Sequence, residues 1–312
     1  MEKILLTGGA GFIGTHIAER LVEDHALVLF DNYRRDSLSG LALAGHANVT
    51  VLKGDVLNTD DVAAALRDVD RVIHLAAIAG VSSYYKMPLK VLQVNILGTV
   101  NLLEAAVQAG VKQFISFSTS EVYGSEARNV TEQDPHGIGP TSDKRWTYAT
   151  SKLASENFVL RYGEEHGFDS TCLRPFNVYG PRQTGEGAIS NFCTAALKGE
   201  ALKVYGDGKA IRAWCYVTDM VDAVLLAMEK ESAAGQSFNI GNADTAVSTV
   251  ELAEIVASLV PGASIEYEEI DRAEVAVRIP NVDKARSLLG FDPKVGLAEG
   301  LQQTLDWYRE TL

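Results

Sequence analysis

The sequence predicts a doubly wound α/β protein, with a parallel sheet covered by helices on both faces and a smaller C-terminal α/β domain. Short apolar runs alternate with helical patterns over the first two-thirds of the chain, an order typical of parallel sheets. The apolar runs are nearly continuous, as expected of strands that are buried on both sides. After about Pro175 the alternation becomes less regular. We therefore predict one domain over residues 1–175 and a second over 176–312.

The individual elements follow from apolar periodicity and from the Gly, Pro and Asp residues between them. A helix and a strand within 216–241 are expected to return to the first sheet. The predicted strands are Ile4–Leu6, Leu27–Phe30, Val49–Lys53, Val72–Leu75, Phe114–Phe117, Thr171–Leu173, Leu202–Val204 and Ser237–Ile240. The predicted helices are Gly14–Glu23, Asp60–Leu66, Leu89–Ala109, Tyr148–Glu165, Ile189–Lys198, Asp219–Glu229, Val250–Val260, Asp283–Leu289 and Leu297–Tyr308.

Composition and charge exclude several classes of function. The net charge of −13 opposes binding to nucleic acid or to an anionic membrane, and no apolar run is long enough for a membrane span. The first strand starts at Lys3, which leaves no room for a signal peptide. Cys172, Cys193 and Cys215 show no metal-ligand spacing, so we expect no metal. Reduced thiols indicate a cytoplasmic protein.

A glycine-rich turn directly follows the first predicted strand and begins a helix. Gly8, Gly11 and Gly14 allow the tight turn and the close approach of a pyrophosphate to the backbone, and the helix N-terminus offers free N–H groups. Asp31 ends the second strand, where a carboxylate suits the ribose hydroxyls of NAD. Arg34 and Arg35 follow closely and leave NADP open. We therefore predict a Rossmann-type dinucleotide site, with NAD favoured.

Two further strand ends are candidates for the same site. Asp55 and Val56 end the third strand, where the carboxylate could accept a hydrogen bond from adenine. Leu75, Ala76 and Ala77 follow the fourth strand, and small side chains there would let a flat ring lie on the backbone. Taken alone, Asp55 is better explained as a strand-end cap, and a packed sheet edge explains the small residues after the fourth strand equally well.

Tyr148 and Lys152 have the spacing Y-x-x-x-K, which places both side chains on one helix face. An ammonium group beside a phenol stabilises the phenolate, so we expect the pKa of Tyr148 to be lowered and the residue to act as a base. The stretch Ser118–Gly124 (STSEVYG) follows a predicted strand, at the edge where open α/β sheets bind their ligands. Thr119 could then hydrogen-bond the substrate oxygen that Tyr148 deprotonates.

Taken together, these motifs resemble the extended short-chain dehydrogenase/reductase family that modifies nucleotide sugars. The resemblance covers essentially the whole chain, and it implies NAD-dependent oxidation of the sugar at C4, a nucleotide-sugar substrate and a homodimer formed by the helices at 89–109 and 148–165. Trp214 and Cys215 depart from the family's usual pattern. The residues that it implies for the cofactor are Gly8, Gly11, Phe12, Ile13, Gly14, Asp31, Asn32, Asp55, Val56, Leu75, Ala76, Ala77, Asn95, Tyr148, Lys152, Pro175, Asn177 and Val178. Those for the substrate are Asn177, Arg182, Asn191, Val204, Tyr205, Arg212 and Arg278.

Glu121 separates the reactions that the family catalyses after C4 oxidation. Epimerases usually carry a small residue there, whereas 4,6-dehydratases and uronate decarboxylases carry Glu; the alternative is that Glu121 only caps the following turn. Ser120 is similar to the residue found in decarboxylases and in some dehydratases. Arg145-Trp146 before Tyr148 resembles a decarboxylase, and Arg278 before Pro280 resembles the arginine assigned to a substrate carboxylate, with Arg272 as a competitor.

We therefore expect the catalytic residues to be Thr119, Ser120, Glu121, Tyr148 and Lys152, in a UDP-glucuronate decarboxylase-like enzyme. The alternatives are an NDP-hexose 4,6-dehydratase, a 4-epimerase, and a non-enzymatic protein that senses NAD(P). The presence of Thr119, Tyr148 and Lys152 argues against the last of these.

Overall fold

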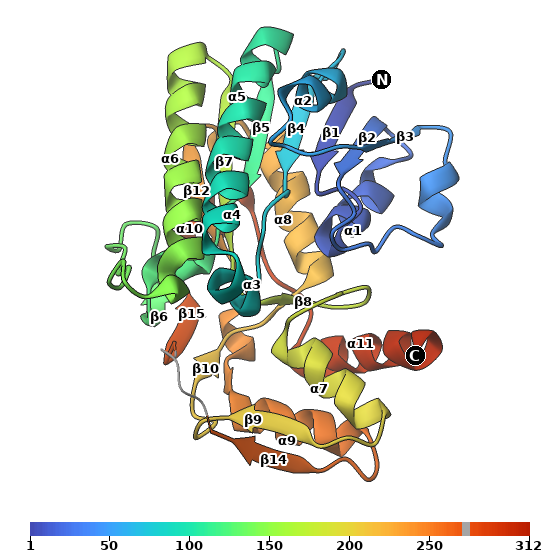
Figure 1. The fold of residues 1–312 in the computed structure, drawn as a ribbon, viewed down its shortest axis with the longest axis vertical. Coiled ribbons are helices and arrows are strands. Elements are labelled where there is room, and N and C mark those ends of the chain that lie inside the picture. Colours follow the sequence, from blue (N-terminus) through green and yellow to red (C-terminus); the bar gives the residue numbers. More distant parts are fainter. Residues whose placement is uncertain (270–274) are drawn as a thin grey trace.

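The computed structural model describes residues 1–269 and 275–312, and its centre is a parallel sheet in the order β12-β7-β5-β4-β1-β2-β3 (Figure 1). Strands β2 and β3 lie on one side of β1, and the strands β4, β5, β7 and β12 lie on the other. This change of direction opens a crevice at the carboxyl ends of β1 and β4, where such sheets bind ligands. The strands are β1 (Lys3–Thr7), β2 (Ala26–Asp31), β3 (Val49–Lys53), β4 (Arg71–His74), β5 (Gln113–Phe117), β7 (Asp169–Pro175) and β12 (Gln236–Ile240).

Helices cover both faces of this sheet, because the strands are apolar on both sides (Figure 1). One core cluster joins the sheet to α1 (Phe12–Leu21), α8 (Val217–Glu229) and α10 (Asp283–Leu289). The other joins it to α2 (Thr59–Ala65), α4 (Pro88–Leu92), α5 (Gly98–Ala109) and α6 (Thr147–His166). The predicted fold class is therefore confirmed.

The helix predicted over Leu89–Ala109 is interrupted by a π-helical turn at Gln93–Leu97. Asn95 lies in this turn with its side chain buried, where it accepts a hydrogen bond from the backbone N–H of Ile78 and donates to Ser151 Oγ. Single π-turns within helices often occur at functional sites. Here the turn joins the loop after β4 to α6.

The remaining elements form the lower part of the molecule in Figure 1 and include several short strands that the sequence did not indicate. A second sheet has the order β13-β10-β15-β6, and it takes β6 from the first half of the chain. The missed strands of two residues are too short to show a periodicity, and the longer missed strands contain charged residues that interrupt an apolar run. The strands are β6 (Glu126–Val130), β8 (Val178–Tyr179), β9 (Leu202–Tyr205), β10 (Ile211–Arg212), β11 (Cys215–Tyr216), β13 (Val247–Ser248), β14 (Ile265–Glu268) and β15 (Val277–Pro280). The other helices are α3 (Val81–Lys86), α7 (Ala188–Leu197), α9 (Thr249–Leu259) and α11 (Leu297–Thr311).

Within the described residues, no helix combines the length and the apolar character needed to cross a membrane.

Candidate functional site

The crevice at the end of β1 holds a cavity of about 420 Å³ that the glycine turn lines. Gly8 has a φ of 72°, and a Cβ there would lie 2.9 Å from the backbone nitrogen of Ala76. A Cβ on Gly14 would lie 2.4 Å from the carbonyl oxygen of Gly8. Both positions therefore require glycine, and their bare backbone leaves the N-terminus of α1 open to a ligand. This cradle fits a dinucleotide pyrophosphate.

Asp31 lines the same cavity, and its carboxylate accepts hydrogen bonds from the backbone N–H groups of Ala10 and Tyr33. Burial raises the pKa of Asp31, and these bonds act in the opposite direction. The other cofactor residues of the sequence prediction that line this cavity are Gly8, Gly11, Phe12, Ile13, Gly14, Asn32, Asp55, Val56, Leu75, Ala76, Ala77, Tyr148, Lys152 and Pro175.

Three residues predicted for the cofactor lie elsewhere. Asn95 does not line the cavity but holds the backbone of Ile78, which does. Asn177 and Val178 line a second cavity. Conversely, the sequence analysis missed lining residues such as Met87, directly before α4, and Lys90, within α4, because nothing in their local pattern marks them as ligand-facing.

The second cavity, of about 1450 Å³, lies against the first, and residues Gln183, Thr184 and Glu186 line both. Arg212 lines it and donates hydrogen bonds to the carbonyls of Ile211 and Val275, which joins β10 to the segment before β15. The predicted substrate residues found here are Asn177, Asn191, Tyr205, Arg212 and Arg278.

Arg182 and Val204, which we predicted to bind substrate, line neither cavity. The guanidinium of Arg182 forms an ion pair with Glu19 on α1 and contacts His16, so its charge is already neutralised. Val204 is fully buried in the core that β9 shares with α7 and α9. Arg272 falls outside the described residues.

Tyr148 and Lys152 are both buried and line the first cavity from α6. Burial raises the pKa of the Tyr148 phenol and the Glu121 carboxylate raises it further, while a hydrogen bond with Thr119 and the charge of Arg35 lower it. Burial lowers the pKa of Lys152 to about 8. The net direction for Tyr148 is opposite to the lowering that we expected from Lys152, because removal of the phenol from water outweighs its polar partners.

Glu121 lies between two arginines at the edge of the second cavity. One carboxylate oxygen lies 2.6 Å from Arg278 Nη1 and the other lies 2.6 Å from Arg145 Nη1. Burial by itself would raise the pKa of Glu121, but the two guanidinium groups lower it to about 2. We call these three residues the charge cluster. With one negative and two positive side chains, it carries a net charge of +1 at neutral pH.

The alternative in which Glu121 caps the following turn is wrong. The 3₁₀ turn η3 (Ser120–Tyr123) is capped by Thr119, whose side chain accepts a hydrogen bond from the backbone N–H of Glu121. The carboxylate of Glu121 is therefore free to meet the arginines. Ser120 and Thr119 are buried and line neither cavity, so the structure does not place Ser120 against a ligand, whereas Thr119 reaches the site through its hydrogen bond with Tyr148.

Tyr84, on α3, was missed by the sequence analysis although it touches both parts of the site. Its ring is stacked on Tyr148 with 5.0 Å between centroids, and Arg145 lies 5.7 Å from its centroid. The local sequence SSYYK carries no signal for this position, because the contact depends on how α3 packs against α6. The arrangement as a whole places a buried phenol at one cavity and a positively charged cluster at the other.

Residues 4–241 match the family described as the NAD dependent epimerase/dehydratase family. A UDP-N-acetyl-alpha-D-glucosaminuronate decarboxylase from Bacillus cytotoxicus is 37% identical, over 99% of this chain and 98% of that protein. UDP-glucuronic acid decarboxylase 3 from Arabidopsis thaliana is 36% identical, over 96% of this chain and 86% of that protein.

Solved structures show the same fold. A UDP-glucose 4-epimerase from Thermotoga maritima, with UDP-glucose, has a TM-score of 0.90 and 32% identity over 99% of both chains. A UDP-glucuronic acid 4-epimerase from Bacillus cereus, in complex with UDP-glucuronic acid and NAD, has a TM-score of 0.89 and 29% identity over 99% of this chain and 100% of that one.

Proposed function

Because the chain belongs to the NAD dependent epimerase/dehydratase family, we propose that it oxidises a nucleotide-linked uronic acid at C4 and then decarboxylates it. The family match and the decarboxylase and epimerase relatives confirm the predicted enzyme class, and the complexes with NAD confirm the predicted cofactor. The specific substrate that we propose is UDP-glucuronate.

In the first step, Tyr148 takes the proton of the sugar 4-hydroxyl, and Thr119 holds the same oxygen by a hydrogen bond. A dinucleotide held by the glycine turn and Asp31 would supply the hydride acceptor for C4, and the positive charge of its oxidised ring would favour the phenolate form of a neighbouring tyrosine. Lys152 adds a second positive charge whenever it is protonated. The raised pKa of Tyr148 therefore keeps the phenol neutral until the positive charges of the oxidised cofactor and of protonated Lys152 are both present.

The net positive charge of the charge cluster is the observation that carries the choice of substrate. Arg145 and Arg278 are buried, and among residues 1–269 and 275–312 the carboxylate that pairs with them is that of Glu121 alone, which neutralises one of the two charges. A buried charge without a counter-charge is costly. The carboxylate of a uronic acid would supply the missing negative charge, whereas the uncharged C6 hydroxymethyl group of a hexose would not.

Decarboxylation then follows from the chemistry of the oxidised sugar. A uronic acid with a ketone at C4 is a β-keto acid, so the electron pair of the C5–C6 bond moves into the C4–C5 enolate as carbon dioxide leaves. Glu121 is ionised at neutral pH and so does not donate a proton. We assign it instead to holding the two arginines in place, and to moving aside as the substrate carboxylate engages them.

The nucleotide would lie in the part of the second cavity that Arg212 and Tyr205 line. A guanidinium there suits the two negative charges of a diphosphate. The curated relatives named above act on glucuronic acid and N-acetylglucosaminuronate, and both of these sugars carry a carboxylate.

A substrate panel tests the proposal. The purified protein is incubated with UDP-glucuronate, UDP-N-acetylglucosaminuronate, UDP-glucose and dTDP-glucose, and the products are weighed by mass spectrometry. Loss of carbon dioxide from a uronate supports the proposal, and Tyr148→Phe serves as the inactive control. Loss of water from a hexose, with both uronates untouched, would contradict it.

A uronate 4-epimerase is the second candidate, since the charge cluster would bind the same carboxylate without releasing it. The UDP-glucuronic acid 4-epimerase from Bacillus cereus shares the fold over almost the whole chain. The same panel separates the two reactions, because epimerisation leaves the mass unchanged and inverts C4, which proton NMR detects.

We also propose a homodimer and a cytoplasmic location. Leu89, Leu97 and Phe158 are large apolar side chains that remain exposed on the helical layer formed by α4, α5 and α6, and a partner subunit would cover them. Sedimentation velocity would measure the mass directly. The three cysteines are free thiols, as a reducing compartment would keep them.

A further inference from the structure

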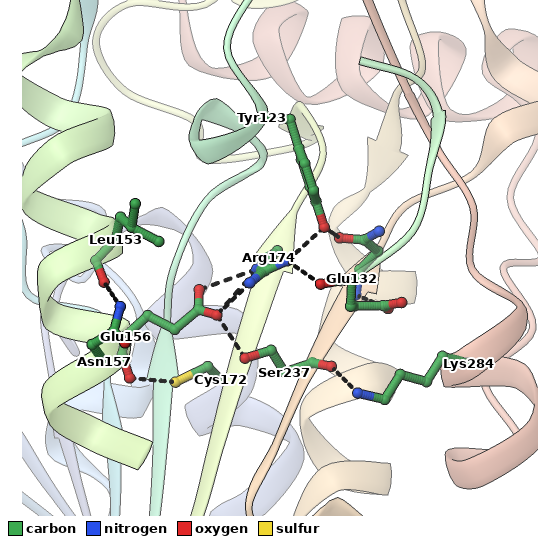
Figure 2. Close-up of polar contacts among 10 residues, drawn as sticks. Tyr123, Glu132, Leu153, Glu156, Asn157, Cys172, Arg174, Ser237 and Lys284 are labelled. Atoms are coloured by element: carbon green, nitrogen blue, oxygen red, sulfur yellow. Dashed lines mark hydrogen bonds and ion pairs between the residues drawn. The ribbon is translucent and has the colours of Figure 1, made fainter. Parts of the chain in front are cut away.

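A buried polar network around Arg174, Glu156 and Tyr123 is not used by the mechanism above, and these three residues line neither cavity (Figure 2). Its centre is Arg174, at the end of β7, only 4% exposed. Glu156, on α6 and also 4% exposed, accepts hydrogen bonds from Nε and Nη2 of Arg174, with the shortest at 2.6 Å. Nη1 of Arg174 donates to the hydroxyl of Tyr123 at 2.6 Å.

The network reaches every element that carries a proposed catalytic residue. Glu156 lies one helical turn after Lys152, on the helix that also carries Tyr148. Tyr123 lies two residues after Glu121, on the same 3₁₀ turn. Arg174 therefore connects the element of the first step to the element of the second, and it directly precedes Pro175, which lines the dinucleotide cavity.

A second branch extends the network toward Arg278. The Tyr123 hydroxyl donates to Asn239 Oδ1 at 2.8 Å, and Asn239 Nδ2 donates to the carbonyl of Asn281, directly after β15. Arg278, within β15, donates to the carbonyl of Gly124 at 2.8 Å as well as to Glu121. The turn that carries Glu121 is thus bonded to Arg174 through Tyr123 and to Arg278 through Gly124 and Glu121, in addition to the ion pair of Glu121 with Arg145.

Stability alone does not explain such a pair. A buried ion pair costs desolvation that its attraction only roughly repays, and an apolar pair of similar volume is often at least as stable. What a planar guanidinium adds is geometry, since three of its nitrogens fix two partners at set angles. A shift of about 1 Å in a reacting group can cost about 10²-fold in rate, so fixed angles matter most beside a catalytic centre.

We propose that Arg174, held by Glu156 and Tyr123, is a positioning residue that fixes the turn bearing Glu121 relative to the helix bearing Tyr148 and Lys152. This inference rests on the proposed function, because it concerns the passage from the first reaction step, C4 oxidation, to the second, decarboxylation. With the network intact, the 4-keto sugar formed beside Tyr148 lies at a position where the charge cluster also binds its carboxylate. When the network is disrupted, oxidation at C4 keeps its rate and decarboxylation becomes slower.

Tyr123→Phe is the sharpest test, because it removes one hydroxyl and leaves the Arg174–Glu156 pair in place. The matched control is Tyr179→Phe, since Tyr179 is equally buried, has a hydroxyl that contacts the carbonyl of Leu297, and lines neither cavity. Under single-turnover conditions with UDP-glucuronate, NADH absorbance reports the first step and released carbon dioxide reports the second.

For Tyr123→Phe we expect unchanged NADH formation and carbon dioxide release slowed about 25-fold, because the hydroxyl makes two hydrogen bonds, to Arg174 and Asn239, and the loss of each typically gives about fivefold. NADH and the 4-keto sugar then accumulate, whereas Tyr179→Phe changes thermal stability without changing this partition. Arg174→Lys should give a larger effect in the same direction, because one ammonium group cannot bridge Glu156 and Tyr123.

Equal slowing of both steps, or no change in either, would overturn the positioning role while the wild-type enzyme still decarboxylates. If the wild-type protein itself releases no carbon dioxide, the proposed function fails and this inference fails with it. The wild-type reaction therefore distinguishes the two failures.

Discussion

The two cavities of the site are built in different ways. In the dinucleotide cavity, the glycine turn and Ala76 bring backbone and small side chains to the carboxyl ends of neighbouring strands and form its tightest points, while charged side chains such as Asp31, Asp55 and Lys152 also line it. The second cavity contains the charge cluster and several aromatic side chains, from segments as distant in sequence as Tyr84 and Tyr308. The first selects its ligand by steric fit to the backbone, and the second by side-chain charge.

This difference teaches where specificity can change. A backbone cradle tolerates few substitutions because almost every added atom collides, so it stays suited to one cofactor. A cavity built from side chains can exchange a single charge without loss of the fold. The reaction catalysed by such a scaffold is therefore decided in the second cavity, at positions such as Glu121 and Arg145.

Replacing Tyr148 by Phe should have the largest effect, because Tyr148 lines the first cavity but acts on the ligand of the second. We expect turnover to fall about 10³-fold, the contribution typical of a general base, while the NAD dissociation constant changes less than about twofold. Carbon dioxide release and calorimetric titration with NAD measure the two quantities. Tyr162→Phe, further along α6, is the control. Retained turnover in the Tyr148 variant would remove the basis for the mechanism.

Glu121→Gln should show how much the ion pairs of Glu121 in the second cavity stabilise the folded protein. At pH 7 it leaves two buried arginines without their carboxylate, so we expect the free energy of unfolding to fall by about 3 kcal/mol. The pKa of Glu121 in the folded protein is about 2, below its ordinary value of 4.5. Its stabilisation is therefore complete above pH 4.5 and is lost as the pH falls toward 2.

The difference in stability between wild type and Glu121→Gln should accordingly shrink between pH 4.5 and pH 2. Urea unfolding of both proteins at several pH values measures it, and titration of all other groups cancels in the comparison. A difference that stays constant over this range would mean that Glu121 is not held ionised by the arginines.

Arg145→Gln and Arg278→Gln should sharpen the comparison further by lowering the charge that we assign to uronate recognition. We expect kcat/KM for UDP-glucuronate to fall about 10²-fold in each, as for truncation of one partner in a buried charge pair. Binding of UDP-glucose, whose sugar carries no carboxylate, should change much less. Arg128→Gln, at an exposed position in β6, is the matched control. Equal losses for both sugars would show that the arginines are not selective for a carboxylate.

Gly14→Ala should have the smallest effect and tests the first cavity. The added Cβ would lie 2.4 Å from the Gly8 carbonyl oxygen, so we expect a loss of about 1–3 kcal/mol in the free energy of unfolding and weaker NAD binding. At Gly45, no heavy atom lies within 4 Å of an added Cβ, and Gly45→Ala should stay within about 0.5 kcal/mol. Thermal unfolding of both variants, with and without NAD, provides the measurement. If the two variants behave alike, the close approach at Gly14 is not limiting.

The sequence by itself determined the sheet, the helical layers and most of the dinucleotide cavity. These depend on local signals, since an apolar run, a glycine turn and the acid at the end of the next strand each lie within a few residues of one another. Parallel strands then bring their carboxyl ends to one edge, so Gly8, Asp31 and Ala76 become neighbours without further information. Tyr148 and Lys152 were predictable for the same reason, because both lie on one helix.

Only the tertiary structure decided the charge state of the site. The ion pairs of Glu121 join positions 121, 145 and 278, and no local periodicity links residues so far apart. The stacking of Tyr84 on Tyr148, the engagement of Arg182 by Glu19 and the raised pKa of Tyr148 likewise depend on packing and desolvation. Burial and long-range pairing are properties of the assembled chain, because the energy of a charge depends on everything that surrounds it.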